Sequence, residues 1–194
     1  KAAQSRTFDL GRFESGDNVN HVLNLKLETP GSLGVYTLTS GLQLVEDASG
    51  MLSLTGTTGV SGNITETVTG LRCLTDPGNP SSGDSFTLTF NYEVLKNVPV
   101  QIKFVDGSGS LISQQNRSFS LGDTDVEWLD VYSFFGTPYV PDPTSSSTIQ
   151  HYIARNTQSV TAANGQFRMN GNTPEVRVAA DMISPTVLNV EYTI

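Results

Sequence analysis

The sequence predicts an all-β protein, an antiparallel β-sandwich with a jelly roll as the specific topology. Three observations predict it. Apolar and polar residues alternate with period two in the clearest segments, and turn signals separate these segments. Helical periodicity never extends beyond about two turns, and residues 149–155 are the best helical candidate. Because each strand has one apolar face, we expect antiparallel sheets with one solvated side.

The alternation is most regular in residues 86–94, where five apolar residues alternate with polar ones: Phe86, Leu88, Phe90, Tyr92 and Val94. Similar strands are expected at residues 23–27, 100–104, 176–180 and 188–194. Residues 126–135 differ, because apolar side chains fall on both faces. This strand is therefore either covered on both sides or part of a contact surface.

Turn signals set the predicted domain organisation. Gly-containing pairs and triplets such as Ser15-Gly16-Asp17, Asp106-Gly107 and Asn164-Gly165 occur at the spacing of a sandwich. They predict one β-sandwich (jelly-roll) domain over residues 1–194. Similar strand and hairpin patterns at residues 44–52 and 104–112 leave a second interpretation open, in which two similar β halves meet near residues 76–82.

Charge and composition exclude several kinds of partner. The 194 residues include 11 Lys and Arg against 19 Asp and Glu, giving a net charge of −8 with no basic cluster. This charge opposes nucleic-acid binding, which requires phosphate neutralisation. No apolar run approaches the roughly 18 residues of a membrane span, so we expect no membrane insertion. The low charged fraction and the neutral polar residues favour an extracellular or virion surface location.

Catalytic chemistry is not indicated. His21 and His151 lie far apart with no carboxylate or cysteine at ligand spacing, so no zinc site is predicted. Neither a nucleophile elbow nor a phosphate-binding loop is present. Cys73 is the only cysteine and its apolar neighbours predict a buried, inert thiol. We therefore expect a non-enzymatic protein that uses no cofactor.

Calcium is the one metal for which residues can be named. Asp123 and Asp125 follow a glycine, and Glu46 and Asp47 lie in an expected turn. The alternative is that such aspartates cap the turn backbone, which we favour. Glycosylation sequons begin at Asn63 and Asn116, and their use depends on the source of the protein.

Two groups of apolar residues are the candidate sites. Trp128, Tyr132 and Tyr139 are candidate ligand-binding residues, since flat amphipathic rings suit sugar stacking or a protein interface. Phe8, Leu10 and Phe13 are candidate assembly residues, because a short apolar arm can add to the sheet edge of a neighbour. The same arm can equally be the first strand of its own sandwich.

Residues 82–194 also resemble the general layout of jelly-roll carbohydrate-binding modules. The similarity rests on the strand start at Ser82-Gly83-Asp84, the strand in residues 126–135 and the closing hairpin in residues 176–194. The resemblance implies a recognition fold without assigning a ligand.

The sequence thus favours a structural surface protein, a self-assembling subunit of an extracellular filament or of a virion exterior (capsid, decoration or fibre). Its expected partners are copies of itself. The alternative is a carbohydrate-binding module or adhesin whose exposed aromatic residues bind surface glycans. A third hypothesis, a β-sandwich glycoside hydrolase, would use Glu127 and Asp130, although a strand places these two carboxylates on opposite faces.

Overall fold

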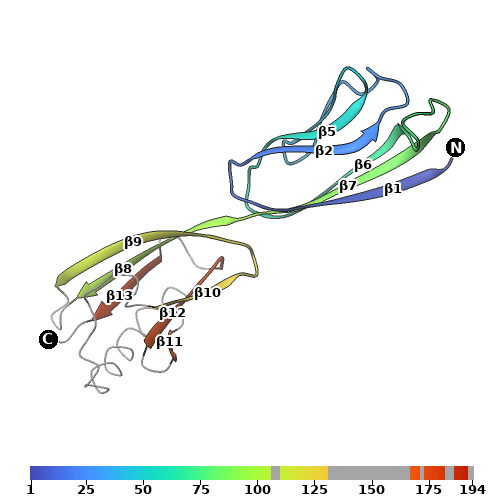
Figure 1. Ribbon diagram of the computed structural model, residues 1–194. Coiled ribbons are helices and arrows are strands. Elements are labelled where there is room, and N and C mark those ends of the chain that lie inside the picture. Colours follow the sequence, from blue (N-terminus) through green and yellow to red (C-terminus); the bar gives the residue numbers. More distant parts are fainter. Residues whose placement is uncertain (106–109, 131–166, 171–172, 182–185, 192–194) are drawn as a thin grey trace. The chain divides into compact units, whose positions relative to one another are not determined.

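The computed structural model contains two structural units, residues 1–95 and residues 96–194, and each is described by itself. It describes residues 1–105, 110–130, 167–170, 173–181 and 186–191 (Figure 1). All regular secondary structure in these ranges is β-strand, so the all-β prediction is confirmed. None of the described residues form a helix that is long and apolar enough to span a membrane.

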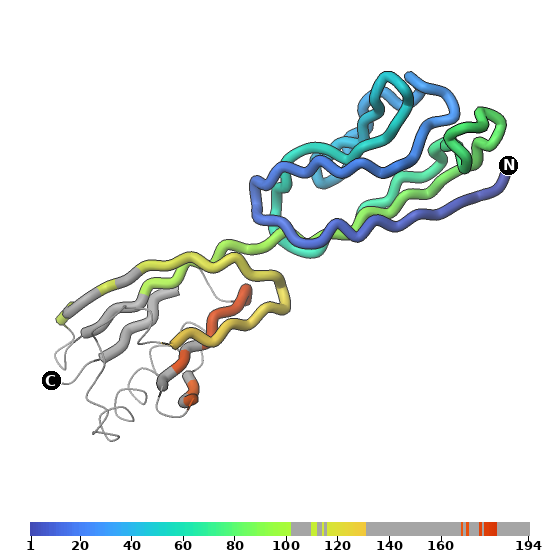
Figure 2. The backbone as a smooth tube through the Cα atoms, in the orientation of Figure 1, coloured from blue at the N-terminus to red at the C-terminus, as the bar shows by residue number. Residues whose placement is uncertain are grey.

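The first unit is a sandwich of two sheets. One sheet has the order β1-β7-β6, and the other has the order β2-β5-β4-β3. Figures 1 and 2 show them as two layers, with β2 and β5 above β1, β6 and β7. The strands are β1 (Ala3–Phe13), β2 (Asn18–Lys26), β3 (Val35–Thr37), β4 (Gln43–Glu46), β5 (Met51–Thr57), β6 (Gly62–Leu74) and β7 (Gly83–Val94).

The core of this unit lies between the two sheets, where the predicted alternation places it. Every second residue of β7 from Phe86 to Val94 is buried, whereas the residues between them are half-buried. The facing sheet contributes leucines that are almost completely buried: Leu23, Leu25, Leu42, Leu44, Leu52 and Leu54. The burial of these side chains stabilises the fold by about 25 cal/mol for each Å² of apolar surface removed from water.

Strand β7 is the centre of its sheet. It pairs antiparallel with β6 through a hairpin and parallel with β1, in register from Ala3↔Ser85 to Phe13↔Val94. The pairing of β1 shifts between Asp9 and Arg12, where Gly11 adopts a positive φ of 85° that favours glycine.

The second unit contains two further sheets, with the orders β13-β8-β9 and β10-β12-β11. Its buried apolar residues include Val98, Val100, Leu121 and Val178. Strand β13 pairs parallel with β8, so each unit pairs the first and last of its described strands in parallel. The strands are β8 (Lys96–Val105), β9 (Leu111–Leu121), β10 (Val126–Asp130), β11 (Phe167–Asn170), β12 (Thr173–Ala179) and β13 (Thr186–Glu191).

These sheets agree with the predicted β-sandwich, whereas a jelly roll specifically is not confirmed. The boundary between the two units in the sequence falls between Leu95 and Lys96. Residues 76–82, where the sequence suggested a junction, form the loop of the β6–β7 hairpin inside the first unit. The helical candidate at residues 149–155 lies outside the described residues.

The face assignment of β7 can be tested with a single charge. Phe90 is completely buried, so Phe90→Asp places an unpaired carboxylate in the core and should cost about 4 kcal/mol or more of unfolding free energy. The neighbouring Thr89→Asp, on the opposite face of the strand, should change it by about 1 kcal/mol or less. Chemical denaturation measures both, and similar unfolding free energies for the two variants would contradict the assignment.

Candidate functional site

The predicted assembly residues Phe8, Leu10 and Phe13 lie in β1 and pack against the core of the first unit. The Phe8 ring stacks on the Phe90 ring with centroids 5.5 Å apart, and the Phe13 ring meets Tyr92 edge-on at 6.1 Å. The arm therefore serves as the first strand of its own sandwich in this structure.

Polar side chains also hold β1 along β7. Arg12 donates to the Glu93 carboxylate at 2.7 Å, and the Asn91 amide donates to Asp9 at 3.0 Å. Near the start of the strand, Gln4 donates to Asp84 at 3.2 Å. Strand β1 is thus an edge strand that is joined to β7 by its backbone, its apolar face and its polar side chains.

The loop that connects β1 to β2 is fixed by Thr58. The Thr58 hydroxyl donates to the Glu14 carbonyl at 2.6 Å, and the Gly16 amide donates to the Thr58 carbonyl at 3.0 Å. Thr58 is itself buried. These bonds make the β1–β2 connection an anchored turn and not a loose tether.

The opposite edge of the same sheet, β6, is mostly unpaired within the described residues. On the side of β6 that faces away from β7, the described residues form one bridge, between Cys73 and Leu27. Next to this bridge, the Glu28 amide donates to the Arg72 carbonyl at 2.8 Å. After Glu28 the chain moves away and forms β3 in the other sheet. Among the described residues, no strand pairs with Ile64 to Gly70 of β6 on this side.

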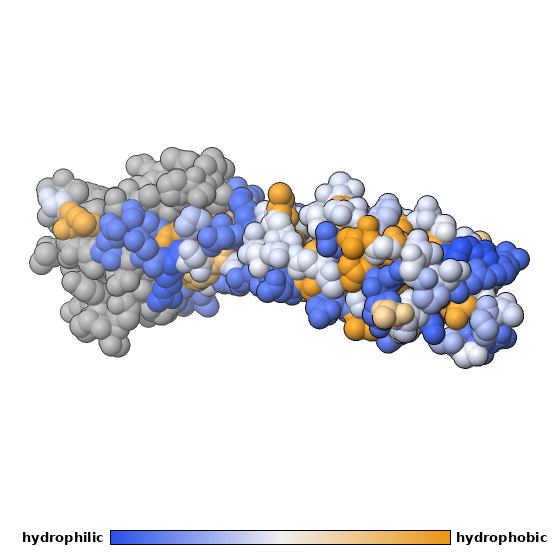
Figure 3. Space-filling model, turned by 90° about the horizontal axis from the view of Figure 1, so that it is seen from above, coloured by the Kyte–Doolittle hydropathy of each residue, from blue (hydrophilic) through white to orange (hydrophobic). Residues whose placement is uncertain are grey.

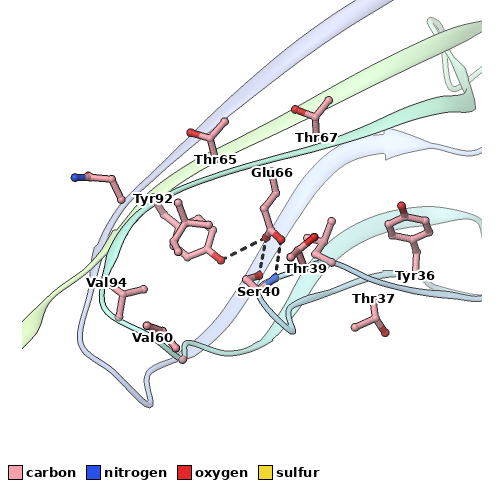
Figure 4. Close-up of a pocket in the computed structure, with 14 residues that line it drawn as sticks. Tyr36, Thr37, Thr39, Ser40, Val60, Thr65, Glu66, Thr67, Tyr92 and Val94 are labelled. Carbon is pink, nitrogen blue, oxygen red and sulfur yellow. Dashed lines mark hydrogen bonds between the residues drawn. The ribbon is translucent and has the colours of Figure 1, made fainter.

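A pocket of about 590 Å³ lies beside this free edge (Figure 4). One wall is Asn63–Thr67 of β6, and the other is Tyr36–Ser40, which comprises part of β3 and the following turn. Tyr92 and Val94 of β7 also line it, as do Gly59 and Val60. We call this the Glu66 pocket, because Glu66 is the only charged residue among the described residues that line it.

The Glu66 carboxylate is held by hydrogen bonds from neutral groups. One oxygen accepts the Ser40 amide at 2.7 Å, and the other accepts the Ser40 hydroxyl at 2.6 Å and the Tyr92 hydroxyl at 3.5 Å. Burial, and to a smaller extent the nearby Glu66 charge, raise the pKa of the Tyr92 hydroxyl, which therefore remains a donor at neutral pH. Glu66 is 8% exposed and forms no ion pair with a described residue.

A tight turn positions Ser40 for this contact. The Leu38 amide bonds to the Leu42 carbonyl at 2.8 Å, and the Gly41 amide bonds to the Leu38 carbonyl at 3.0 Å. Gly41 adopts a positive φ of 94°, which a side chain would disfavour. The turn directs the Ser40 amide toward β6, where Glu66 lies (Figure 4).

The predicted ligand-binding aromatics are only partly described. Trp128 lies in β10 and is half-buried, with the Arg168 guanidinium carbon 4.2 Å from its ring centroid. Arg168 is in turn bonded to Glu175 at 2.5 Å, so the guanidinium group covers one face of the indole ring. Tyr132 and Tyr139 lie outside the described residues.

Two of the acidic residues, Asp47 and Asp125, serve as backbone caps, whereas Glu46 is the last residue of β4 and does not lie in the expected turn. One Asp47 oxygen accepts the Ser49 amide at 2.8 Å and the Met51 amide at 3.0 Å, which confirms the favoured interpretation of this aspartate. Asp125 likewise accepts the Gly122 amide at 2.9 Å. Within the described ranges no three His, Cys, Asp or Glu residues are grouped as a metal would require.

Cys73 is completely buried, as predicted. Removal from water raises the pKa of its thiol from 9.0 to about 11, because burial disfavours the thiolate. The thiol is thus protonated and unreactive at neutral pH.

Glu66 was not among the residues predicted from the sequence. A signal was present, since Glu66 occupies the inward register of β6 between Ile64 and Val68, and a carboxylate in an apolar register is unusual.

Comparisons with protein-family models, curated proteins and solved structures find no match to this chain.

The Cys73 thiol should make stability fall at high pH. Its pKa is raised in the folded state, so the folded protein binds more protons than the unfolded chain between about pH 9 and pH 11. The unfolding free energy should therefore fall across that interval by about 2 to 3 kcal/mol more in the native protein than in Cys73→Ala. Urea titrations at several pH values measure the difference, and parallel pH profiles would contradict it.

Proposed function

We propose that this protein is a non-enzymatic structural subunit that assembles with copies of itself by exchange of β1. The supporting observation is the position of β1, a complete edge strand whose apolar residues finish the core of the first unit. A β1 strand from a second copy could make the same contacts with β7. Domain exchange of this kind needs no new interface and is a low-cost route to oligomers.

The direction of exchange decides the product. If two copies exchange β1 reciprocally, the result is a closed dimer. If each copy gives β1 to the next, the contact is heterologous and the assembly grows as a filament. The main-chain hydrogen bonds supply affinity, and the side chains of Phe8, Leu10 and Phe13 supply specificity.

The anchored β1–β2 loop sets the conditions for exchange. Thr58 holds this loop in the folded subunit, so β1 cannot leave without breaking those bonds. We therefore expect exchange while chains fold at high concentration, and slow exchange between subunits that are already folded. An extracellular filament or a virion exterior, where many copies accumulate, is the proposed setting.

A pair of introduced cysteines distinguishes exchange from self-pairing. Thr7 and Thr89 are register partners on the outer face of β1 and β7. In a Cys73→Ala background, we refold the Thr7→Cys/Thr89→Cys protein at high concentration and oxidise it. Exchange predicts a ladder of covalent oligomers on a non-reducing gel, together with polymers in negative-stain electron micrographs.

The matched control is Thr67→Cys/Thr89→Cys, which uses the register pair of the β6–β7 hairpin. This pair is joined within one chain whether or not β1 is exchanged, so it should give covalent monomers alone. If the Thr7→Cys/Thr89→Cys protein also gives monomers alone, β1 stays in its own sheet and the proposed mode of assembly is wrong.

A further inference from the structure

We propose that the Glu66 pocket is a binding site for an extended peptide segment that carries a Lys or Arg side chain. The segment would lie along the free edge of β6 and place its basic group beside the Glu66 carboxylate. This site is at the opposite edge of the sheet from β1, and the inference does not depend on β1 exchange.

The shape of the pocket favours an extended chain. Its β6 wall consists of five consecutive residues, Asn63–Thr67, whose side chains alternate between the two faces of the strand. From Ile64 onward, the backbone edge of β6 that faces the pocket has no partner strand among the described residues. Five strand residues span about 16 Å, and an added strand would use this edge as in β-augmentation.

The charge of the pocket selects a basic group. The described residues that line it include one carboxylate and no cation. Neutral donors orient the Glu66 carboxylate, including the Tyr92 hydroxyl, and the Tyr36 ring lines the same pocket. A pocket that combines a carboxylate with aromatic walls is a favourable environment for an ammonium or guanidinium group.

The entrance supplies apolar contacts for the neighbouring side chains. Val60 is 84% exposed and Tyr36 is 44% exposed, although both are apolar or aromatic. Figure 3 shows hydrophobic residues on the surface of the first unit among neutral and hydrophilic ones. A segment in which apolar residues lie two positions from the basic residue would place them on the same face as that residue.

The probe is the heptapeptide Thr-Val-Thr-Arg-Thr-Val-Thr, blocked at both ends and labelled for fluorescence polarisation. We expect saturable binding to the full chain. Replacement of the arginine with its neutral isostere citrulline should weaken binding about tenfold, which corresponds to about 1.4 kcal/mol. A peptide methylated on alternate backbone nitrogens should lose binding, because it cannot complete the β6 edge.

Protein variants localise the site. Glu66→Gln keeps the size of the side chain and should weaken binding of the arginine peptide about tenfold, while binding of the citrulline peptide stays unchanged. Val60→Lys places a positive charge at the exposed entrance and should weaken the arginine peptide similarly. The matched control Val22→Lys changes a residue that is 53% exposed and away from the pocket, and should bind like the native protein.

Several results would overturn the proposal. If the arginine and citrulline peptides bind equally well, the pocket does not recognise a basic group. If the methylated peptide binds as well as the unmethylated one, the peptide does not add to β6 as a strand. Glu66-dependent binding of a neutral monosaccharide in place of the peptide would make the pocket a sugar site. If Glu66→Gln fails to fold, as judged by circular dichroism, the comparison of Val60→Lys with Val22→Lys decides the question.

Discussion

The inward face of β7 is the constraint on which the first unit depends. β7 is the middle strand of its sheet, and its alternate residues from Phe86 to Val94 are buried against the leucines of the facing sheet. A shift of one residue would turn every one of these side chains to solvent, so the register of β7 is strongly determined. The positions of β1 and β6 follow, because both strands align with β7.

The two edge strands of this sheet differ in how they are held. At one edge, apolar rings and polar side-chain bonds attach β1 to β7 along its length. On the other side, Leu27 and Glu28 pair with β6 only briefly before the chain forms β3 in the other sheet. Exposed strand edges bind other strands unless they are covered or charged. In the proposed peptide binding, the buried Glu66 would limit which strand can add to β6.

Sequence periodicity predicted the faces of the strands but not their partners. Alternation with period two predicts which side chains point inward, and the burial of Leu23, Leu25 and Phe90 confirms this prediction. Partner choice depends on contacts between residues far apart in the sequence, such as Phe8 with Phe90, and alternation contains no information on these. The role of a residue could be predicted from the sequence where its hydrogen-bond partners are close in the chain, as they are for Asp47 in its turn. Glu66 was missed because its partner Ser40 is 26 residues away.

The net charge of the chain affects the two proposed interactions differently. Copies of a chain with a net charge of −8 repel one another at long range, although salt weakens this repulsion beyond about 10 Å. The proposed exchange of β1 would tolerate this repulsion, because its main-chain bonds and ring contacts are neutral and its ion pair, Arg12 with Glu93, forms between the two strands themselves. The peptide binding proposed for the Glu66 pocket differs, because it would draw part of its energy from an opposite charge. An acidic chain with few cations is a poor source of that charge, so we propose a basic segment of another protein at β6 and a copy of this chain at β7.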